Sequence, residues 1–383
     1  MKTVAKFRMR CLSVLSFTIL TGVPLVQSQY RKEIRIPDIP GYKTLKCDFH
    51  IHTVFSDGNV WPTIRVREAW ASGLDAIAIT DHLENQVHDK DIKADRNRSF
   101  EIVKDGGKSL GLIVIKGAEI TKNMPPGHLN AIFIQDAETL NQTDWRIAVK
   151  TAVDQGAFVF WNHPGWNGQQ PDGIARWYDE QTEMLNKGWL KGIEIVNDHE
   201  YYPQVQRWCL EKKLAMIGNS DAHDPILMSY DAAEGEKRPI TLVFAKERTE
   251  DAIQEALLSR RTAVCWNGDL FGETSYLKPL FENAVQIQNR SLVLKGRNRE
   301  YIPITNTSDV DFHLMLDGQV EGLNIPADLV LKNNRTVLFE VRAPRNQMTG
   351  QKTFPLPYRI ANLRTTPEEG LPFVLELKVE FVK

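Results

Sequence analysis

The sequence predicts two domains, an α/β barrel over residues 44–282 and an all-β sandwich over residues 283–383. Two observations carry this prediction. Up to about residue 280, apolar strand-like runs alternate with segments of helical spacing, which is typical of a mostly parallel, barrel-like α/β domain. Beyond that point the helical spacing disappears, and short alternating runs are separated by Asn, Gly and Pro. That pattern is typical of a β-sandwich.

The first 28 residues have the features of a secretory signal peptide. Four basic residues precede an apolar stretch over residues 11–25, and the segment ends at the small residue Ser28. The apolar stretch is short for a membrane span, so we expect cleavage after Ser28 and a periplasmic or secreted protein. Residues 29–43 then form a lead-in to the first domain.

Charge and cysteine content exclude several functional classes. Without the signal segment, 43 Lys and Arg remain against 49 Asp and Glu. A mildly acidic chain lacks the basic excess of nucleic-acid-binding proteins, so no nucleic-acid partner is indicated. Cys47, Cys209 and Cys265 are too widely spaced for a disulfide framework or a Cys-rich zinc site. We expect them to be buried apolar side chains.

The elements follow from the local patterns. In the first domain, apolar runs predict strands at residues 44–49, 75–80, 112–116, 129–134, 157–161, 192–196, 214–217 and 240–245. Helical spacing and end signals predict helices at 64–71, 145–154 and 251–258, the last with Thr249 as N-cap. In the second domain, alternation predicts strands at 292–294, 312–316, 336–341 and 375–379.

Most of the nine histidines lie in short motifs that we expect at the end of a strand-like run of the first domain or in the loop that follows it. The motifs are His50-Ile51-His52 with Asp57, Thr80-Asp81-His82, Gly117-Ala118-Glu119, Gly127-His128, Asn162-His163-Pro164 and Asp221-Ala222-His223. In an α/β barrel, the carboxyl ends of the strands form the active face. In a strand, residues two apart point to the same side, so one strand end can supply two ligands to one metal. The set predicts a multinuclear metal hydrolase.

The ligand types narrow the choice of metal. Histidine and carboxylate ligands without thiolate suit manganese, zinc or iron. A carboxylate such as Glu119 can place one oxygen on each of two ions. Such a centre lowers the pKa of bound water and neutralises charge on a phosphoryl group, so it needs no serine or cysteine nucleophile.

Taken together, these motifs closely resemble those of the polymerase and histidinol phosphatase (PHP) superfamily over residues 44–270. The resemblance implies a distorted (β/α)7 barrel with two or three divalent ions. It also implies the ligands of each ion: His50, His52, Glu119 and Asp221 for the first, Asp57, His82 and His223 for the second, and Glu119, His128 and His163 for a third. An export signal and a β-sandwich tail resemble the secreted bacterial phosphodiesterase branch of the superfamily.

The expected function is therefore an exported metal-dependent phosphoesterase. It would cleave a small phosphate ester, most favourably a diester, by attack of metal-bound hydroxide. The expected catalytic residues are Glu119 and Asp57 in the metal centre and His199, which could protonate the leaving alkoxide. An exposed loop position accounts for His199 equally well.

Two other functions stay open. A carboxylic or carbamic ester hydrolase could use the same metal centre, and the sandwich could make the protein a glycan- or polymer-binding module. An oligomer is also compatible with the sequence.

Several further side chains have two interpretations. Lys122 could contact a phosphate oxygen or be a solvated lysine, and His88 could belong to a lid or to the surface. Core packing accounts for some of Trp161, Trp166 and Trp177, and one of them is a candidate wall of an apolar pocket.

Overall fold

The structure is a computed structural model that describes residues 30–93, 95–231, 235–343 and 349–382. The predicted signal peptide lies outside these residues. Among the helices that are described, none is both long and apolar enough to span a bilayer.

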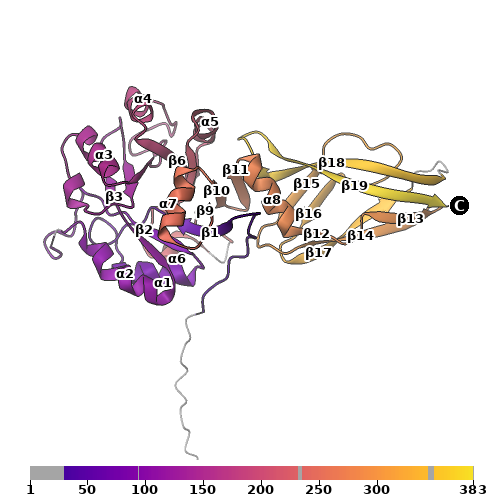
Figure 1. Ribbon diagram of the computed structural model, residues 1–383, viewed down its shortest axis with the longest axis horizontal. Helices are drawn as coiled ribbons and strands as arrows, with labels where there is room; N and C mark the ends of the chain where they lie inside the picture. The colour runs from indigo at the N-terminus through magenta and orange to yellow at the C-terminus, as the bar shows by residue number, and fades with distance from the viewer. Residues whose placement is uncertain (1–29, 94, 232–234, 344–348, 383) are drawn as a thin grey trace, which may run out of the picture. The chain divides into compact units, whose positions relative to one another are not determined.

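The first domain alternates strands and helices around a buried sheet. In Figure 1 the helices α1, α2 and α3 lie around the strands β1, β2 and β3. The strands are β1 (Lys43–Asp48), β2 (Ala76–Ile79), β3 (Ile113–Ile120), β4 (Leu129–Ile132), β5 (Phe158–Trp161), β6 (Leu190–Asn197), β7 (Glu200–Tyr201), β8 (Ala215–Asn219), β9 (Ile240–Ala245), β10 (Thr262–Trp266) and β11 (Asp269–Gly272). The helices are α1 (Pro62–Ala71), α2 (Arg98–Leu110), the short 3-10 helix η1 (Glu138–Leu140), α3 (Trp145–Asp154), α4 (Asp179–Asn186), α5 (Pro203–Lys212), α6 (Ile226–Ser229), α7 (Glu250–Leu258) and α8 (Thr274–Ala284).

The strands of this domain form a mixed sheet, whereas the sequence pattern suggested a mostly parallel one. Strands β1, β2 and β3 are parallel, as are β5, β6 and β8. Strand β4 runs antiparallel to both β3 and β5, and β9 runs antiparallel to β1. The connection between β3 and β4 is only residues 121–128, which is too short for a helical crossover, so the chain must turn back on itself.

Local capping explains where two of the predicted helices begin. The Asp144 side chain accepts a hydrogen bond from the backbone N–H of Arg146 at the start of α3. The Thr249 side chain accepts one from Ala252 at the start of α7, as the sequence predicts. Helix α1 begins with Pro62, whose missing N–H would have no partner in the first turn of a helix.

The interior of the first domain is filled by large apolar side chains. Phe49, Phe158 and Phe160 are fully buried in one cluster, which also holds Cys47. Cys209 is buried in a second cluster, and Cys265 is half-buried. No disulfide links the three cysteines, so the expectation of unpaired, largely buried thiols is confirmed.

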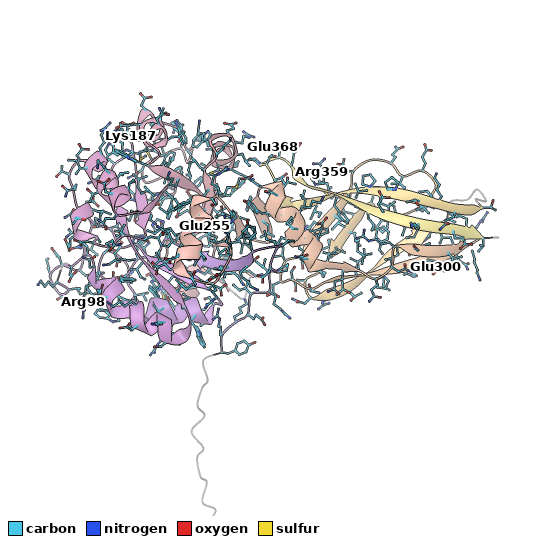
Figure 2. All side chains as sticks on the ribbon, in the orientation of Figure 1. Arg98, Lys187, Glu255, Glu300, Arg359 and Glu368 are labelled. Carbon is cyan, nitrogen blue, oxygen red and sulfur yellow. The ribbon has the colours of Figure 1, made fainter. Side chains whose placement is uncertain are left out.

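The second domain consists of strands in two sheets. One sheet contains β12 (Val285–Ile287), β14 (Arg299–Asn306) and β17 (Arg335–Arg342). The other contains β13 (Ser291–Lys295), β15 (Phe312–Leu316), β16 (Asp328–Leu331), β18 (Gly350–Arg364) and β19 (Gly370–Val382). Apolar residues alternate with exposed ones along β19, which places one face of the sheet in the core. Arg359, labelled in Figure 2, lies between the buried Tyr358 and Ile360 on the opposite face of β18, where it pairs with Asp317.

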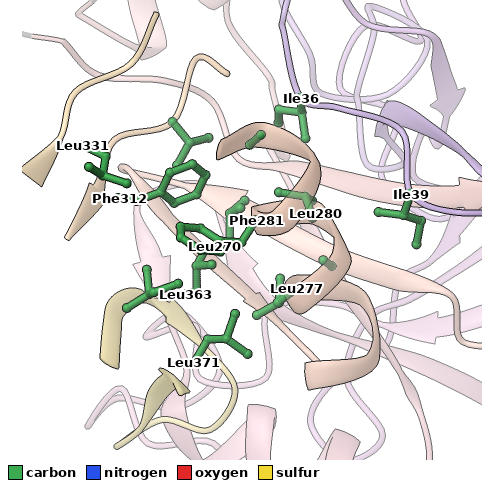
Figure 3. Packing of buried hydrophobic residues seen from close by; sticks show 14 of the residues in the cluster. Ile36, Ile39, Leu270, Leu277, Leu280, Phe281, Phe312, Leu331, Leu363 and Leu371 are labelled. Atoms are coloured by element: carbon green, nitrogen blue, oxygen red, sulfur yellow. The ribbon is translucent and has the colours of Figure 1, made fainter. Parts of the chain in front are cut away.

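A continuous apolar cluster joins the two domains. Strand β11 pairs in parallel with β18, with Leu270 opposite Leu363. Around this pairing, Leu277, Leu280 and Phe281 of α8 pack with sandwich residues, as Figure 3 shows. The shared packing indicates that the sandwich stabilises the barrel rather than being attached by a linker.

Candidate metal centre

The structure brings all nine predicted ligands to one rim of the first domain. His50 and His52 follow β1, His82 follows β2, and His163 follows β5. Asp57 lies in the loop after β1, Glu119 lies near the end of β3, and Asp221 and His223 follow β8. These positions are the carboxyl ends of strands, where a barrel builds its active face.

His128 reaches the same rim by a different route. It precedes β4 instead of following a strand, contrary to the expectation that the motifs lie at or after strand ends. Because β4 runs antiparallel to β3, with Leu129 opposite Ile120, the start of β4 lies beside the end of β3. The antiparallel turn therefore carries His128 next to Glu119.

The nine side chains form four overlapping groups whose ligand atoms lie within 4.8 Å of one another. The groups are His52, Asp57, His82 and His223; His50, His52 and Asp221; His50, Glu119 and His163; and His82, Glu119 and His128. The overlap is wider than in the expected ligand sets, which share only Glu119, because His50, His52 and His82 also each belong to two groups.

Glu119 lies at the centre of the groups. Its Oε2 is 3.4 Å from Nε2 of His50, 3.4 Å from Nε2 of His52 and 2.9 Å from Nδ1 of His82. Its Oε1 faces other histidines, at 2.9 Å from Nδ1 of His128 and 3.6 Å from Nε2 of His163. The two oxygens of this one buried carboxylate therefore face different histidines, so Glu119 could serve as a ligand to more than one ion.

Asp221 and Asp57 complete the two ends of the cluster. Oδ1 of Asp221 lies 3.1 Å from Nε2 of His50 and 2.9 Å from Nε2 of His52. Oδ1 of Asp57 lies 3.2 Å from Nε2 of His223, and its Oδ2 lies 3.4 Å from Nε2 of His82. The shortest contacts of each carboxylate are thus to different imidazoles, while His52 and His223 lie within 4 Å of both.

Unsatisfied polar atoms show that the cluster fits divalent ions. Among the described residues, four buried ligand atoms lie close to other ligand atoms but form no hydrogen bond: His52 Nε2, His128 Nδ1, Asp57 Oδ1 and Asp221 Oδ1. Burying such atoms unpaired costs free energy that metal coordination would offset. The nitrogen and oxygen donors suit manganese, zinc or iron.

The backbone conformation of two ligand residues supports the assignment of a functional site. His163 has φ 28° and Asp221 has φ 51°, both in the left-handed region that side chains other than glycine rarely adopt. The Glu194 carboxylate accepts a hydrogen bond of 2.8 Å from the His163 N–H and helps to hold that conformation. Strain of this kind is concentrated at functional sites.

The carboxylates and imidazoles of the cluster shift one another's pKa values. Burial alone would raise the pKa of Glu119, but the charges of His82 and His50 outweigh it and hold the pKa well below its usual range. Burial also opposes charge on the imidazoles. Neighbouring carboxylates overcome it, raising the pKa of His82 to about 10 and that of His223 to about 9. The pKa of His52 is lowered to about 3 by burial and by the charges of His223 and His82.

These pKa values predict that metal uptake releases protons. In the metal-free protein at about pH 7, His82 and His223 carry protons because their pKa values lie above that pH. A metal binds only the neutral imidazole, so Mn²⁺ binding must displace those protons, and affinity should fall as pH is lowered. Calorimetric titrations in buffers of different ionisation enthalpy would measure the release. Heats that are independent of the buffer would contradict the prediction.

Glu194 is an important residue that sequence reasoning missed. Its Oε1 lies 2.9 Å from Nδ1 of His50, and its Oε2 accepts a hydrogen bond of 2.8 Å from Asn197. Asn219 donates a further bond of 2.9 Å to Oε1. Such a carboxylate fixes the tautomer of His50, leaving Nε2 free for a metal. The sequence feature that could have identified Glu194 is its position as an acidic residue inside the apolar run of β6.

Arg65 was also missed. The side chain is 2% exposed and donates hydrogen bonds to the carbonyl oxygens of His52 at 2.9 Å, Ala222 at 2.8 Å, His223 at 2.6 Å and Asp224 at 2.7 Å. It therefore ties the loop after β1 to the loop after β8. The sequence feature that could have identified Arg65 is its position on the apolar face of α1, beside the buried Val66 and Ala69.

His199 lies outside all four ligand groups. Its exposed side chain places Nε2 3.1 Å from the carbonyl oxygen of Ser229 and 3.5 Å from Oδ1 of Asp198. The role as general acid stays a prediction. His88 lies closer to the centre, with Nε2 3.2 Å from the carbonyl oxygen of Gly58, the residue after Asp57.

The Lys122 ammonium group is bound by two neighbouring residues. Its Nζ lies 2.6 Å from a carboxylate oxygen of Glu84 and donates to the carbonyl oxygen of Gln142 at 2.7 Å. The ammonium group is therefore already paired, which does not favour a role in binding phosphate.

Comparisons with known proteins agree with this fold. A mixed α/β barrel with such a ligand cluster defines a metal-dependent hydrolase. A two-domain protein from Bacteroides vulgatus containing a predicted PHP-like metal-dependent phosphoesterase has 42% identity, covering 91% of this chain and 100% of its own, with a TM-score of 0.86. The chain belongs to this PHP-like family. The predicted fold class, an α/β PHP-type barrel followed by an all-β sandwich, is confirmed.

Two further similarities cover single parts of the chain. An uncharacterized protein of Methanocaldococcus jannaschii is 39% identical over 196 residues, which is 47% of this chain and 83% of that protein. Residues 285–376 match a family model described as an Ig-like domain.

Proposed function

We propose that the protein is a metal-dependent phosphodiesterase that acts outside the cytoplasm on a small phosphate ester. The observation that carries the proposal is the fully buried Glu119, whose two oxygens face different histidines in a largely buried cluster of nine ligand residues. Divalent ions held there would activate water and neutralise charge on a phosphoryl group. The predicted signal peptide supports the proposed location.

The protein's own residues hold the centre in shape. Glu194 orients His50 through a bond of 2.9 Å, and Thr121 places its hydroxyl 2.6 Å from Nδ1 of His82. Asn162 donates a hydrogen bond of 2.9 Å to Oε1 of Glu119. Fixed imidazoles and carboxylates keep their donor atoms directed at one point, which favours metal binding without reorganisation.

The charge around the centre favours a diester over a monoester. Within the described ranges, no lysine or arginine forms an ion pair with any of the nine ligands. The nearby Arg65 is engaged by backbone carbonyls, and Arg238 is paired with Asp48. A monoester dianion gains most from arginine or lysine contacts, whereas a diester carries a single charge. We therefore infer a preference for the singly charged substrate.

A panel of esters of one alcohol tests the proposal. We expect bis(4-nitrophenyl) phosphate to be hydrolysed faster than 4-nitrophenyl phosphate or 4-nitrophenyl acetate by protein loaded with Mn²⁺, Zn²⁺ or Fe²⁺. The Glu119→Gln variant, purified in parallel, controls for contaminating esterases. Faster cleavage of the acetate would point to a carboxylic ester hydrolase, and faster cleavage of the monoester would overturn the diester preference.

A further inference from the structure

We propose that Trp166 forms a binding surface for a planar, apolar group of the substrate ester, such as an aryl substituent. This inference rests on the proposed phosphodiesterase function and names a class of substrate for it. Trp166 is 40% exposed, whereas Trp161 is fully buried and Trp177 is half-buried against Trp161 and Trp208. Of the three tryptophans beside the His163 motif, Trp166 alone leaves a large part of its indole open to solvent.

The exposed indole lies directly beside the candidate metal centre. Its ring centroid is 5.3 Å from that of His163, in an edge-on arrangement, and 5.8 Å from that of His128. These two histidines face Oε1 of Glu119, so the tryptophan borders that end of the cluster. An ester bound at the ions would therefore have one of its substituents within reach of the indole.

The turn that carries Trp166 holds the ring in place. The Trp166 N–H donates to the carbonyl oxygen of His163 at 3.0 Å, and its own carbonyl accepts from Gln170 at 2.8 Å. A Cβ atom at Gly168 would lie 2.4 Å from the indole, so only glycine lets the ring lie across the turn. Gln169 ties the turn to the neighbouring loop by a bond of 2.9 Å to the carbonyl of Lys122.

A fixed, exposed indole suits aromatic or other planar apolar groups. Aromatic pairs contribute about 0.5–1.5 kcal/mol beyond their buried area, which corresponds to roughly 2- to 10-fold in affinity. Because the turn already holds Trp166, little side-chain entropy is lost when a group stacks on it. The surface should therefore distinguish aryl from methyl substituents.

Binding of two phosphinates tests the inference. Diphenylphosphinate and dimethylphosphinate carry one negative charge like a diester but have no ester bond to cleave. In calorimetric titrations of Mn²⁺-loaded protein, we expect Trp166→Ala to lower the affinity for diphenylphosphinate roughly 2- to 10-fold relative to the affinity for dimethylphosphinate. Trp166→Phe should retain most of the difference. Trp189→Ala is the matched control, because Trp189 lies just before β6, away from the rim, beside Lys187.

The outcomes separate this inference from the proposed function. If wild-type protein binds both phosphinates and Trp166→Ala leaves their affinity ratio unchanged, the surface is not at Trp166, while the phosphodiesterase proposal stands. If neither phosphinate binds and no phosphate diester is cleaved, the proposed function itself fails.

Discussion

Replacing Glu119 with Gln is expected to abolish metal-dependent hydrolysis and to lower the metal content of the folded protein. The amide keeps the shape of the side chain but removes the negative charge that faces His50, His52 and His82 through Oε2, and His128 and His163 through Oε1. Loss of a shared ligand weakens the binding of more than one ion. The decrease in metal affinity should therefore exceed the about 10- to 100-fold typical of residues that only support ligands.

Metal analysis by mass spectrometry, activity assays and circular dichroism would measure the three expected effects. Glu183→Gln is the matched control, because Glu183 lies on α4, where its ion pairs are with Arg146 and Lys187 and with none of the nine ligands. Wild-type metal content in Glu119→Gln would show that Glu119 is not a shared ligand.

The ligand cluster was predictable because strand geometry constrains it strongly. His50 and His52 are two residues apart at a strand end, and strand ends of one barrel meet at one rim. Glu194 and Arg65 carry no comparable sequence signal. Each acts through contacts between segments distant in the chain, such as Glu194 with Asn219 or Arg65 with Asp224. Only the folded arrangement shows which backbone or side-chain groups face them.

The same limit applies to the fold. Strands such as β9 and β15 could be placed from their apolar runs, and their observed bounds agree with the predicted ones. The direction of β4 was missed, because apolar alternation does not specify which neighbour a strand pairs with. The parallel pairing of β11 with β18 was missed for the same reason, since Leu270 and Leu363 are far apart in the sequence.

Arg65 combines burial with an unusual set of acceptors. Its guanidinium donates to four carbonyl oxygens of two loops, one carrying His52 and the other carrying Asp221 and His223. Glu68 supplies a carboxylate at 3.1 Å. A planar group with five N–H donors can satisfy several carbonyls at fixed angles, whereas a lysine ammonium offers three donors at one point. Arg65 therefore acts as a positioning residue that sets the distance between the two ligand loops.

Arg65→Lys is accordingly expected to lower metal affinity by about 10- to 100-fold, the range found for groups that orient metal ligands. Arg261→Lys is the matched control. Arg261 is also buried, at 7% exposure, and donates to the carbonyl oxygen of Phe244 at 2.9 Å and to Glu255 at 3.0 Å, with no ligand among these partners. Both variants should lower the melting temperature of the metal-free protein, but only Arg65→Lys should weaken Mn²⁺ binding in calorimetric titrations. Equal Mn²⁺ affinity in the two variants would reduce Arg65 to a purely structural residue.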